Sequence, residues 1–157
     1  MLMPISSLKD DDYLNDFRVN ALGAVRCIRH YHRSLRKTGK ASVVLFSTVA
    51  VQQGMPFHSS VAAAKGAVEG ITRALAAEFA PNIRVNCIAP TITDTPLAAK
   101  ILRNEQTRES LTQRHPLKMM PEAQHTSQLA AFLLSEGAAA ITGQIMGVDA
   151  GLGSLRL

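Results

Sequence analysis

Two polar side chains lie where their residue types are unfavourable unless they have polar partners. Lys65 is the only cation on a helical stripe whose other members are small or apolar, so it either faces a functional site or snorkels to the surface. Asn20 lies in the middle of an expected helix, where asparagine lowers helix stability, so it has a polar role or is a tolerated exposed residue. A cation facing a site favours the deprotonated form of a neighbouring hydroxyl, as proton-transfer chemistry requires.

A hydroxyl and an imidazole complete the set of candidate groups. Thr48 follows Ser47 at the end of an apolar run, and its hydroxyl either contacts a ligand or bonds to the backbone at the strand end. The imidazole of His58 can donate or accept a proton, which makes it a candidate acid. A histidine directly before Ser59 and Ser60 is more typical of a helix start or an exposed loop.

Alternating helices and strands must position these groups. Apolar spacing predicts helices over residues 10–37 and 59–79, and short β-branched runs predict strands over 41–48, 83–89 and 145–148. Strands that alternate with helices indicate right-handed crossovers and a parallel sheet with helices on both faces. The sequence therefore predicts an α/β fold, and its length fits a single domain over residues 1–157.

Between the first and second strands, residues 52–58 are expected to form a loop. The stretch between the second and third strands is less regular, with helical pieces expected outside the sheet over residues 97–102 and 105–114 and a further helix opening at Pro121. Residues 149–157 form an expected tail.

Several motifs, in order along the chain, resemble the short-chain dehydrogenase/reductase family. Between Val43 and Pro96 a strand ends in Ser/Thr, a Gly/Pro loop and a helix starting AxxK follow, and IRVN leads into a strand closed by proline. The segments VNALG (19–23), ITGQ (141–144) and VDAG (148–151) resemble the family's helix asparagine motif and its C-terminal strand and turn. The resemblance covers essentially the whole chain and implies an NAD(P)-dependent oxidoreductase acting on carbonyl or alcohol substrates. It identifies no particular substrate.

The resemblance also implies roles for the polar residues. In that family a tyrosine is the general acid/base, a lysine four residues later lowers its pKa and holds the nicotinamide ribose, a serine orients the carbonyl and an asparagine anchors a relay water. These catalytic roles carry over to Lys65, Thr48 and Asn20. The tyrosine position is occupied by Val61, which can neither donate nor accept a proton, so the family's mechanism cannot run through it. His58 is the alternative acid.

The cofactor contacts are only partly matched. Residues 90–95 (PTITDT) resemble the family's Pro-Gly-x-x-x-Thr segment, which touches the nicotinamide carboxamide. Together with Lys65, this implies cofactor contacts at Pro90, Thr93 and Thr95. Thr91 replaces the glycine, and the freedom to adopt a positive φ is lost with it.

These residues contain no Gly-rich strand-turn-helix fingerprint. The expected fold is therefore a partial Rossmann-like sheet that lacks the N-terminal mononucleotide-binding half. NAD or NADP is the cofactor that the resemblance implies, and the missing turn argues against binding by this chain alone.

Composition excludes several other functions. The net charge is +5, but the basic residues are scattered along the chain and are dense only over residues 26–40. Their helical spacing there favours a solvated helix face over a nucleic-acid site. Cys27 and Cys87 lack metal-ligand spacing and are expected to be buried free thiols, which fits the cytoplasm and argues against a metal site. No run approaches a membrane span.

The expected partner is a second copy of the chain. The strand over 41–48 would lack a neighbour on one side, and an apolar strand with an open edge promotes association. The family's dimers bury the equivalents of helices 10–37 and 59–79, so a homo-oligomer through these helices is expected. An alternative to catalysis is a non-catalytic oligomerising or regulatory remnant of the family.

Overall fold

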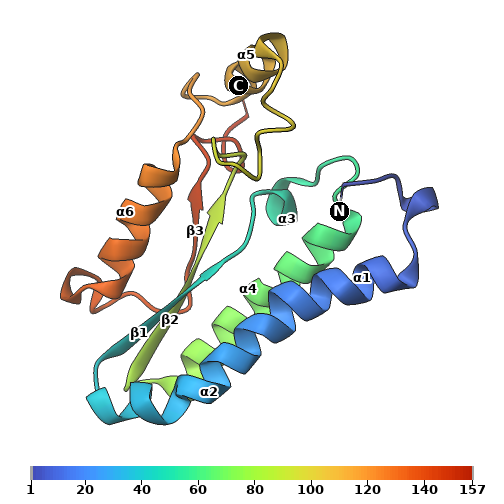
Figure 1. Cartoon of the computed structure of the whole chain (residues 1–157). Helices are drawn as coiled ribbons and strands as arrows, with labels where there is room; N and C mark the ends of the chain where they lie inside the picture. Colours follow the sequence, from blue (N-terminus) through green and yellow to red (C-terminus); the bar gives the residue numbers. More distant parts are fainter. Residues whose placement is uncertain (1, 157) are drawn as a thin grey trace.

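The computed structural model describes residues 2–156 and contains a parallel sheet of three strands (Figure 1). The strands are β1 (Ala41–Phe46), β2 (Ile83–Pro90) and β3 (Ile145–Val148), in the spatial order β1-β2-β3. In β1 and β2 the register pairs Ala41 with Ile83 and Phe46 with Ile88. The expected α/β class and parallel sheet are confirmed.

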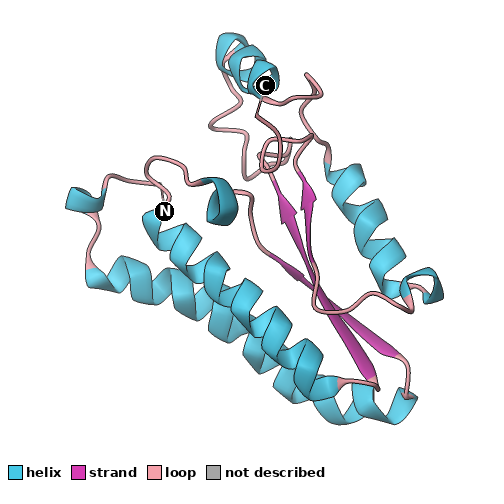
Figure 2. Cartoon of the chain, turned by 180° about the vertical axis from the view of Figure 1, so that it is seen from behind, coloured by secondary structure: helices cyan, strands magenta, loops and turns pink. Residues whose placement is uncertain are grey.

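Helices cover both faces of the sheet, as expected (Figures 1 and 2). On one face lie α1 (Asp10–Phe17), η2 (Arg18–Leu22), α2 (Gly23–Thr38) and α4 (Ser59–Phe79), and on the other lies α6 (Ala123–Leu134). Each face has its own apolar core. The larger core includes Ile28, Val68 and Val85, and the smaller includes Ile88 and Leu133.

The first long helix is continuous but not uniform. It was expected over residues 10–37 and runs from Asp10 to Thr38, with one π-helical segment, η2, in its middle. Gly39 ends it in the left-handed conformation at φ 68°, as an αL cap requires. No pattern of residues indicates the π-helical segment, which contains Asn20.

The connecting segments differ from the expectation in three places. The first strand ends at Phe46 rather than at residue 48, because the chain turns there into a short helix, α3 (Ala50–Gln53), that was not expected. The helical piece expected over 97–102 is wrong, since that segment is a series of turns whose first residue, Leu97, is 93% exposed and has no surface to pack against. The helix expected to open at Pro121 begins at Ala123.

Three short elements complete the chain. They are η1 (Ile5–Ser7), α5 (Glu105–Arg114) and η3 (Glu136–Ala138). The bounds of α5 agree with the expected helical piece over 105–114. Figure 1 shows α5 beyond the carboxyl ends of the strands, outside the sheet.

One expectation about the cysteines is wrong. Cys87 is fully buried in β2, but Cys27 is exposed. The reason is helical geometry: the adjacent Ile28 faces the core, which turns Cys27 toward solvent.

The first strand has an open edge. Within the described residues β1 pairs with β2 and with no other strand. No helix in residues 2–156 is both long enough and apolar enough to cross a membrane. Nor do three or more metal-ligating side chains gather anywhere in that part of the chain.

Candidate functional site

Two of the candidate groups lie where β1 ends beside the first half of α4. In parallel α/β sheets, ligands bind beyond the carboxyl ends of the strands. Phe46 ends β1, Ser47 and Thr48 follow it directly, and Lys65 reaches this point from α4. The structure therefore brings Thr48 and Lys65 to the same edge of the sheet.

Lys65 is anchored to the strand end. Its Nζ donates a hydrogen bond to the carbonyl oxygen of Phe46 at 3.0 Å. Burial lowers the pKa of its ammonium group from the ordinary value, and the neighbouring Cys87 opposes that shift. This arrangement holds the cation against the site edge, and an ammonium has further donors available for a ligand.

Thr48 makes the backbone contact that was one of its two expected alternatives. Its Oγ1 accepts a hydrogen bond from the amide of Ala50 at 3.3 Å, a local side-chain-to-backbone bond of the kind that threonine makes in turns. The hydroxyl hydrogen stays available to a ligand, so the role of Thr48 in orienting a carbonyl remains a prediction.

Glu69 is a residue that sequence reasoning missed. Its side chain is almost fully buried, and its Oε1 accepts a hydrogen bond of 2.7 Å from the hydroxyl of Ser47. Lys65 and Glu69 lie four residues apart on α4, so they share a helix face and hold the consecutive residues Phe46 and Ser47. A carboxylate four residues after the lysine, on a helix of small apolar residues, was the signal that could have revealed it.

Cys87 lies beneath this pair. Burial raises the pKa of its thiol to about 11, with Glu69 adding to the shift and Thr72 opposing it. The thiol is therefore neutral and unreactive near neutral pH.

Asn20 lies in the π-helical segment η2, which packs against α4. Its Nδ2 donates to the carbonyl oxygen of Asp16 at 2.9 Å, and the side chain is half-buried. A π-helical turn breaks the regular pattern of backbone bonding, and such turns are frequent at functional sites. The relay role of Asn20 remains a prediction.

Val61 lies in the first turns of α4, four residues before Lys65 and on the same side of the helix. Its side chain is half-buried and has no group that exchanges a proton. The position that holds the catalytic tyrosine in the family that this sequence resembles therefore cannot transfer a proton here.

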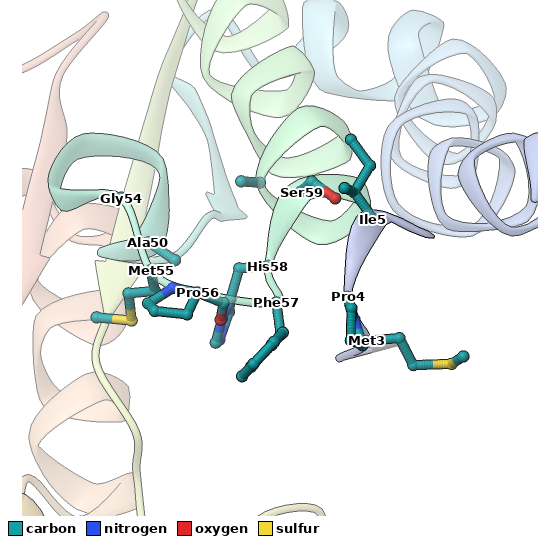
Figure 3. Close-up of a pocket in the computed structure, with 11 residues that line it drawn as sticks. Met3, Pro4, Ile5, Ala50, Gly54, Met55, Pro56, Phe57, His58 and Ser59 are labelled. Carbon is teal, nitrogen blue, oxygen red and sulfur yellow. The ribbon is translucent and has the colours of Figure 1, made fainter. Parts of the chain in front are cut away.

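His58 faces a different hollow. Its Nδ1 contacts the carbonyl oxygen of Pro56 at 2.7 Å, which can only accept, so Nδ1 carries the proton and Nε2 is an acceptor. Figure 3 shows His58 beside Phe57 and across from Met3 and Ile5 in an open, mostly apolar hollow of about 520 Å³. Neither Val61 nor Lys65 lines this hollow, which argues against His58 as a substitute for the tyrosine.

The segment after β2 bonds mainly to itself. The carbonyl oxygen of Pro90 accepts from the amide of Val49 at 3.0 Å. The Thr93 hydroxyl donates to the Thr91 carbonyl at 3.0 Å, and the Thr95 hydroxyl to the Thr93 carbonyl at 3.3 Å. The cofactor contacts expected of these residues remain predictions.

These residues fit only one end of a dinucleotide. Lys65 could hold a ribose hydroxyl, and the threonine hydroxyls can still accept from an amide. The described residues contain no Gly-rich turn whose amides could bind the pyrophosphate. The whole cofactor therefore does not fit this chain.

Comparisons with known proteins agree on one group of enzymes. The family model described as enoyl-(acyl carrier protein) reductase matches residues 1–153. A tropinone reductase homolog of Arabidopsis thaliana is 34% identical over 153 residues, which are 97% of this chain and 58% of that protein. A 3-oxoacyl-(acyl-carrier-protein) reductase of Thermotoga maritima is 33% identical and is likewise covered over 58% of its length.

Solved structures show the same relationship. A gluconate 5-dehydrogenase from Burkholderia cenocepacia, in complex with NADP and tartrate, superposes with a TM-score of 0.93 at 25% identity, over 99% of this chain and 62% of that one. The aldohexose dehydrogenase of Thermoplasma acidophilum gives a TM-score of 0.94 at 26% identity, over 99% of this chain and 65% of that one. The chain thus spans about three fifths of the length of the relatives it matches.

Proposed function

Because the chain belongs to the short-chain dehydrogenase/reductase family, we propose that it carries part of a nicotinamide-linked oxidoreductase framework but does not itself reduce carbonyls by the family's tyrosine route. The observation that carries this proposal is Val61 at the tyrosine position. Hydride addition to a carbonyl produces an alkoxide, which must receive a proton from a group held beside it. Valine supplies none.

The groups that remain would bind and orient rather than donate. Lys65, held by the Phe46 carbonyl at 3.0 Å, would place a cation beside a bound hydroxyl or carbonyl oxygen. The Thr48 hydroxyl would supply a donor at the same edge of the sheet, and Asn20 a polar group on the helix that packs against α4. These are the site roles we propose for the three residues.

The cofactor class follows from the relatives. The gluconate 5-dehydrogenase structure contains NADP, so we propose NAD or NADP as the cofactor of the framework, with contacts at Lys65, Pro90, Thr93 and Thr95. The residues present offer no cradle for its pyrophosphate, so tight binding by this chain alone is not expected. A cytoplasmic location is proposed from the two unpaired cysteines.

The second candidate function is a non-catalytic oligomerising or regulatory module. The open edge of β1 and the exposed apolar side chains of the first long helix favour it. These side chains are Leu14, Phe17, Val19, Leu22 and Tyr31, which are between 37% and 65% exposed. We propose a homo-oligomer through the helices over residues 10–37 and 59–79, which would cover them.

Steady-state assays test the first proposal. The parent chain, Val61→Tyr and Val61→Phe are incubated with NADH or NADPH and a panel of ketones and aldehydes, and absorbance at the nicotinamide wavelength is followed. We expect no turnover from any of the three, because Val61→Tyr restores a hydroxyl but no pyrophosphate cradle. Val61→Phe controls for the ring alone. Turnover by the parent chain would contradict the proposal, and turnover by Val61→Tyr but not Val61→Phe would show that the hydroxyl was the only missing part.

A further inference from the structure

Thr91, which stands where the resembling family has glycine, is paired with a buried histidine. Its Oγ1 lies 3.0 Å from Nε2 of His115, and the two residues are 7% and 1% exposed. They lie 24 residues apart and flank an excursion of the chain, residues 92–114, that contains α5. This buried contact therefore joins the two ends of the excursion, which form its base.

The second ring nitrogen fixes the chemistry of this contact. Nδ1 of His115 lies 2.8 Å from the carbonyl oxygen of Leu111, which can only accept a hydrogen bond. Nδ1 therefore carries a proton. In the neutral ring Nε2 is then an acceptor, and the Thr91 hydroxyl donates to it. Both ring nitrogens are satisfied without water.

The base of the excursion is also tied to the sheet. The amide of Thr91 donates to the carbonyl of Val148 at 3.2 Å, and the amide of Leu117 donates to the carbonyl of Ala150 at 3.1 Å. Thr91 is absent from the residues with positive φ in the described chain, so a side chain is accommodated there without backbone strain. The replacement of glycine therefore provides a hydroxyl at no conformational cost.

Beyond this base the excursion has two buried apolar side chains, Ala98 and Leu102, which are 8% and 5% exposed, while Leu97 and Ile101 are 93% and 43% exposed. The ion pair of Arg108 with Asp94, at 2.8 Å, lies on the surface, where such pairs contribute little. The buried contact at the base is therefore a stronger polar restraint on where α5 lies than this ion pair.

We propose that His115 is a positioning residue that, through Thr91, holds residues 92–114 beyond the carboxyl ends of β2 and β3. Where the family has a glycine without a side chain, Thr91 supplies a hydroxyl that bonds to His115. This contact, called the latch, sets how far residues 92–114 can move away from the sheet. The latch itself does not depend on any cofactor. Its importance for ligand access rests on the proposed function, since the excursion lies beyond the carboxyl ends of the strands, where parallel α/β sheets bind ligands.

Hydrogen exchange on the 157-residue chain tests the latch without cofactor or substrate. Thr91→Val removes the hydroxyl at nearly constant volume, and Thr91→Ser keeps it. Loss of one buried hydrogen bond predicts roughly fivefold faster exchange of the α5 amides and of His115 in Thr91→Val, or about 1 kcal/mol at 1.4 kcal/mol per tenfold. Exchange in α4 and β2 is expected to stay unchanged, and Thr91→Ser to resemble the parent.

A second pair of variants keeps the test decisive if Thr91→Val folds poorly. His115→Gln can still reach Thr91 with its terminal amide, whereas the shorter side chain of His115→Asn reaches only toward the Leu111 carbonyl. The asparagine variant is expected to show the faster α5 exchange and the glutamine variant much less of it. Equal exchange in the members of both pairs would overturn the proposal. So would acceleration spread evenly over α4, β2 and α5, because that result means a general loss of stability.

The imidazole also has a spectroscopic signature. Two-bond ¹H–¹⁵N spectra of the parent chain are expected to show the His115 proton on Nδ1. In Thr91→Val the Nε2 resonance is expected to shift while Nδ1 keeps its proton. A proton on Nε2 of the neutral ring in the parent chain would contradict the geometry. None of these readouts depends on enzymatic activity, so they stand or fall separately from the proposed function.

Discussion

Removal of the Ser47 hydroxyl is expected to destabilise the fold by an amount that the structure allows us to work out. Ser47 and Glu69 are 4% and 5% exposed, and their side-chain oxygens are 2.7 Å apart. Glu69 also has a charged partner, Arg73, whose Nη2 lies 3.8 Å from Oε2 of Glu69 on a side chain that is 59% exposed. Ser47→Ala therefore leaves a buried carboxylate with one distant, solvated partner.

The expected loss follows from the charge on the acceptor. A hydrogen bond to a charged group contributes about 1.5–3 kcal/mol, and serine and alanine differ little in volume. We expect Ser47→Ala to lower the free energy of unfolding by about 2 kcal/mol. Glu69→Gln is the matched variant, because its amide still bonds to Ser47 and is less costly to bury. We expect it to cost about 1 kcal/mol or less.

Urea unfolding at neutral pH, followed by circular dichroism, measures these differences. The double variant Ser47→Ala/Glu69→Gln completes a cycle, and an interaction free energy of about 1 kcal/mol or more is expected for groups in direct contact. A loss below about 0.5 kcal/mol for Ser47→Ala, which is the range of ordinary surface changes, would refute the view that Glu69 depends on this hydroxyl.

Three further predictions concern the thiols and the assembly. At pH 8 a thiol reagent should label only Cys27 in the native chain and both cysteines after unfolding, and two rapidly labelled thiols would contradict the burial of Cys87. Folding raises the Cys87 pKa from 9.0 to about 11. The stability that comes from the buried neutral thiol is therefore present below pH 9 and is lost as the pH rises toward 11. In urea titrations, the free energy of unfolding of Cys87→Ala should fall less between pH 9 and pH 11 than that of the parent chain. Sedimentation velocity should show concentration-dependent association of the parent chain, weakened by Phe17→Glu but not by the control Leu97→Glu on the excursion. A monomer at all concentrations would rule out the proposed homo-oligomer.

The regular elements could be predicted from sequence because their signals are local. The helix Ser59–Phe79 has an apolar stripe at helical spacing and a proline two residues after its end, and its predicted bounds match the structure. The predicted bounds of the helix Glu105–Arg114 also match the structure. For residues 97–102 local propensity misled, because a helix of only six residues is not stable by itself, and the segment forms a run of turns that still buries Ala98 and Leu102.

The polar contacts could not be predicted in the same way. The bond between Ser47 and Glu69 joins a strand end to a helix, and the contact between Thr91 and His115 spans 24 residues. Neither contact leaves a repeating pattern of residues along the sequence. Each depends instead on how the helices and strands pack together. The π-helical turn at Asn20 also left no pattern beyond one asparagine in a helix. The departure at Val61, in contrast, was visible from sequence alone because it is a matter of residue type.

Calorimetric titration of the 157-residue chain with NADPH measures cofactor binding by these residues. We expect no binding heat at micromolar concentrations, because they supply Lys65 for one ribose but no turn for the pyrophosphate. A saturable isotherm with a micromolar dissociation constant, abolished by Lys65→Met, would contradict the claim that this chain carries only part of a nicotinamide-linked framework.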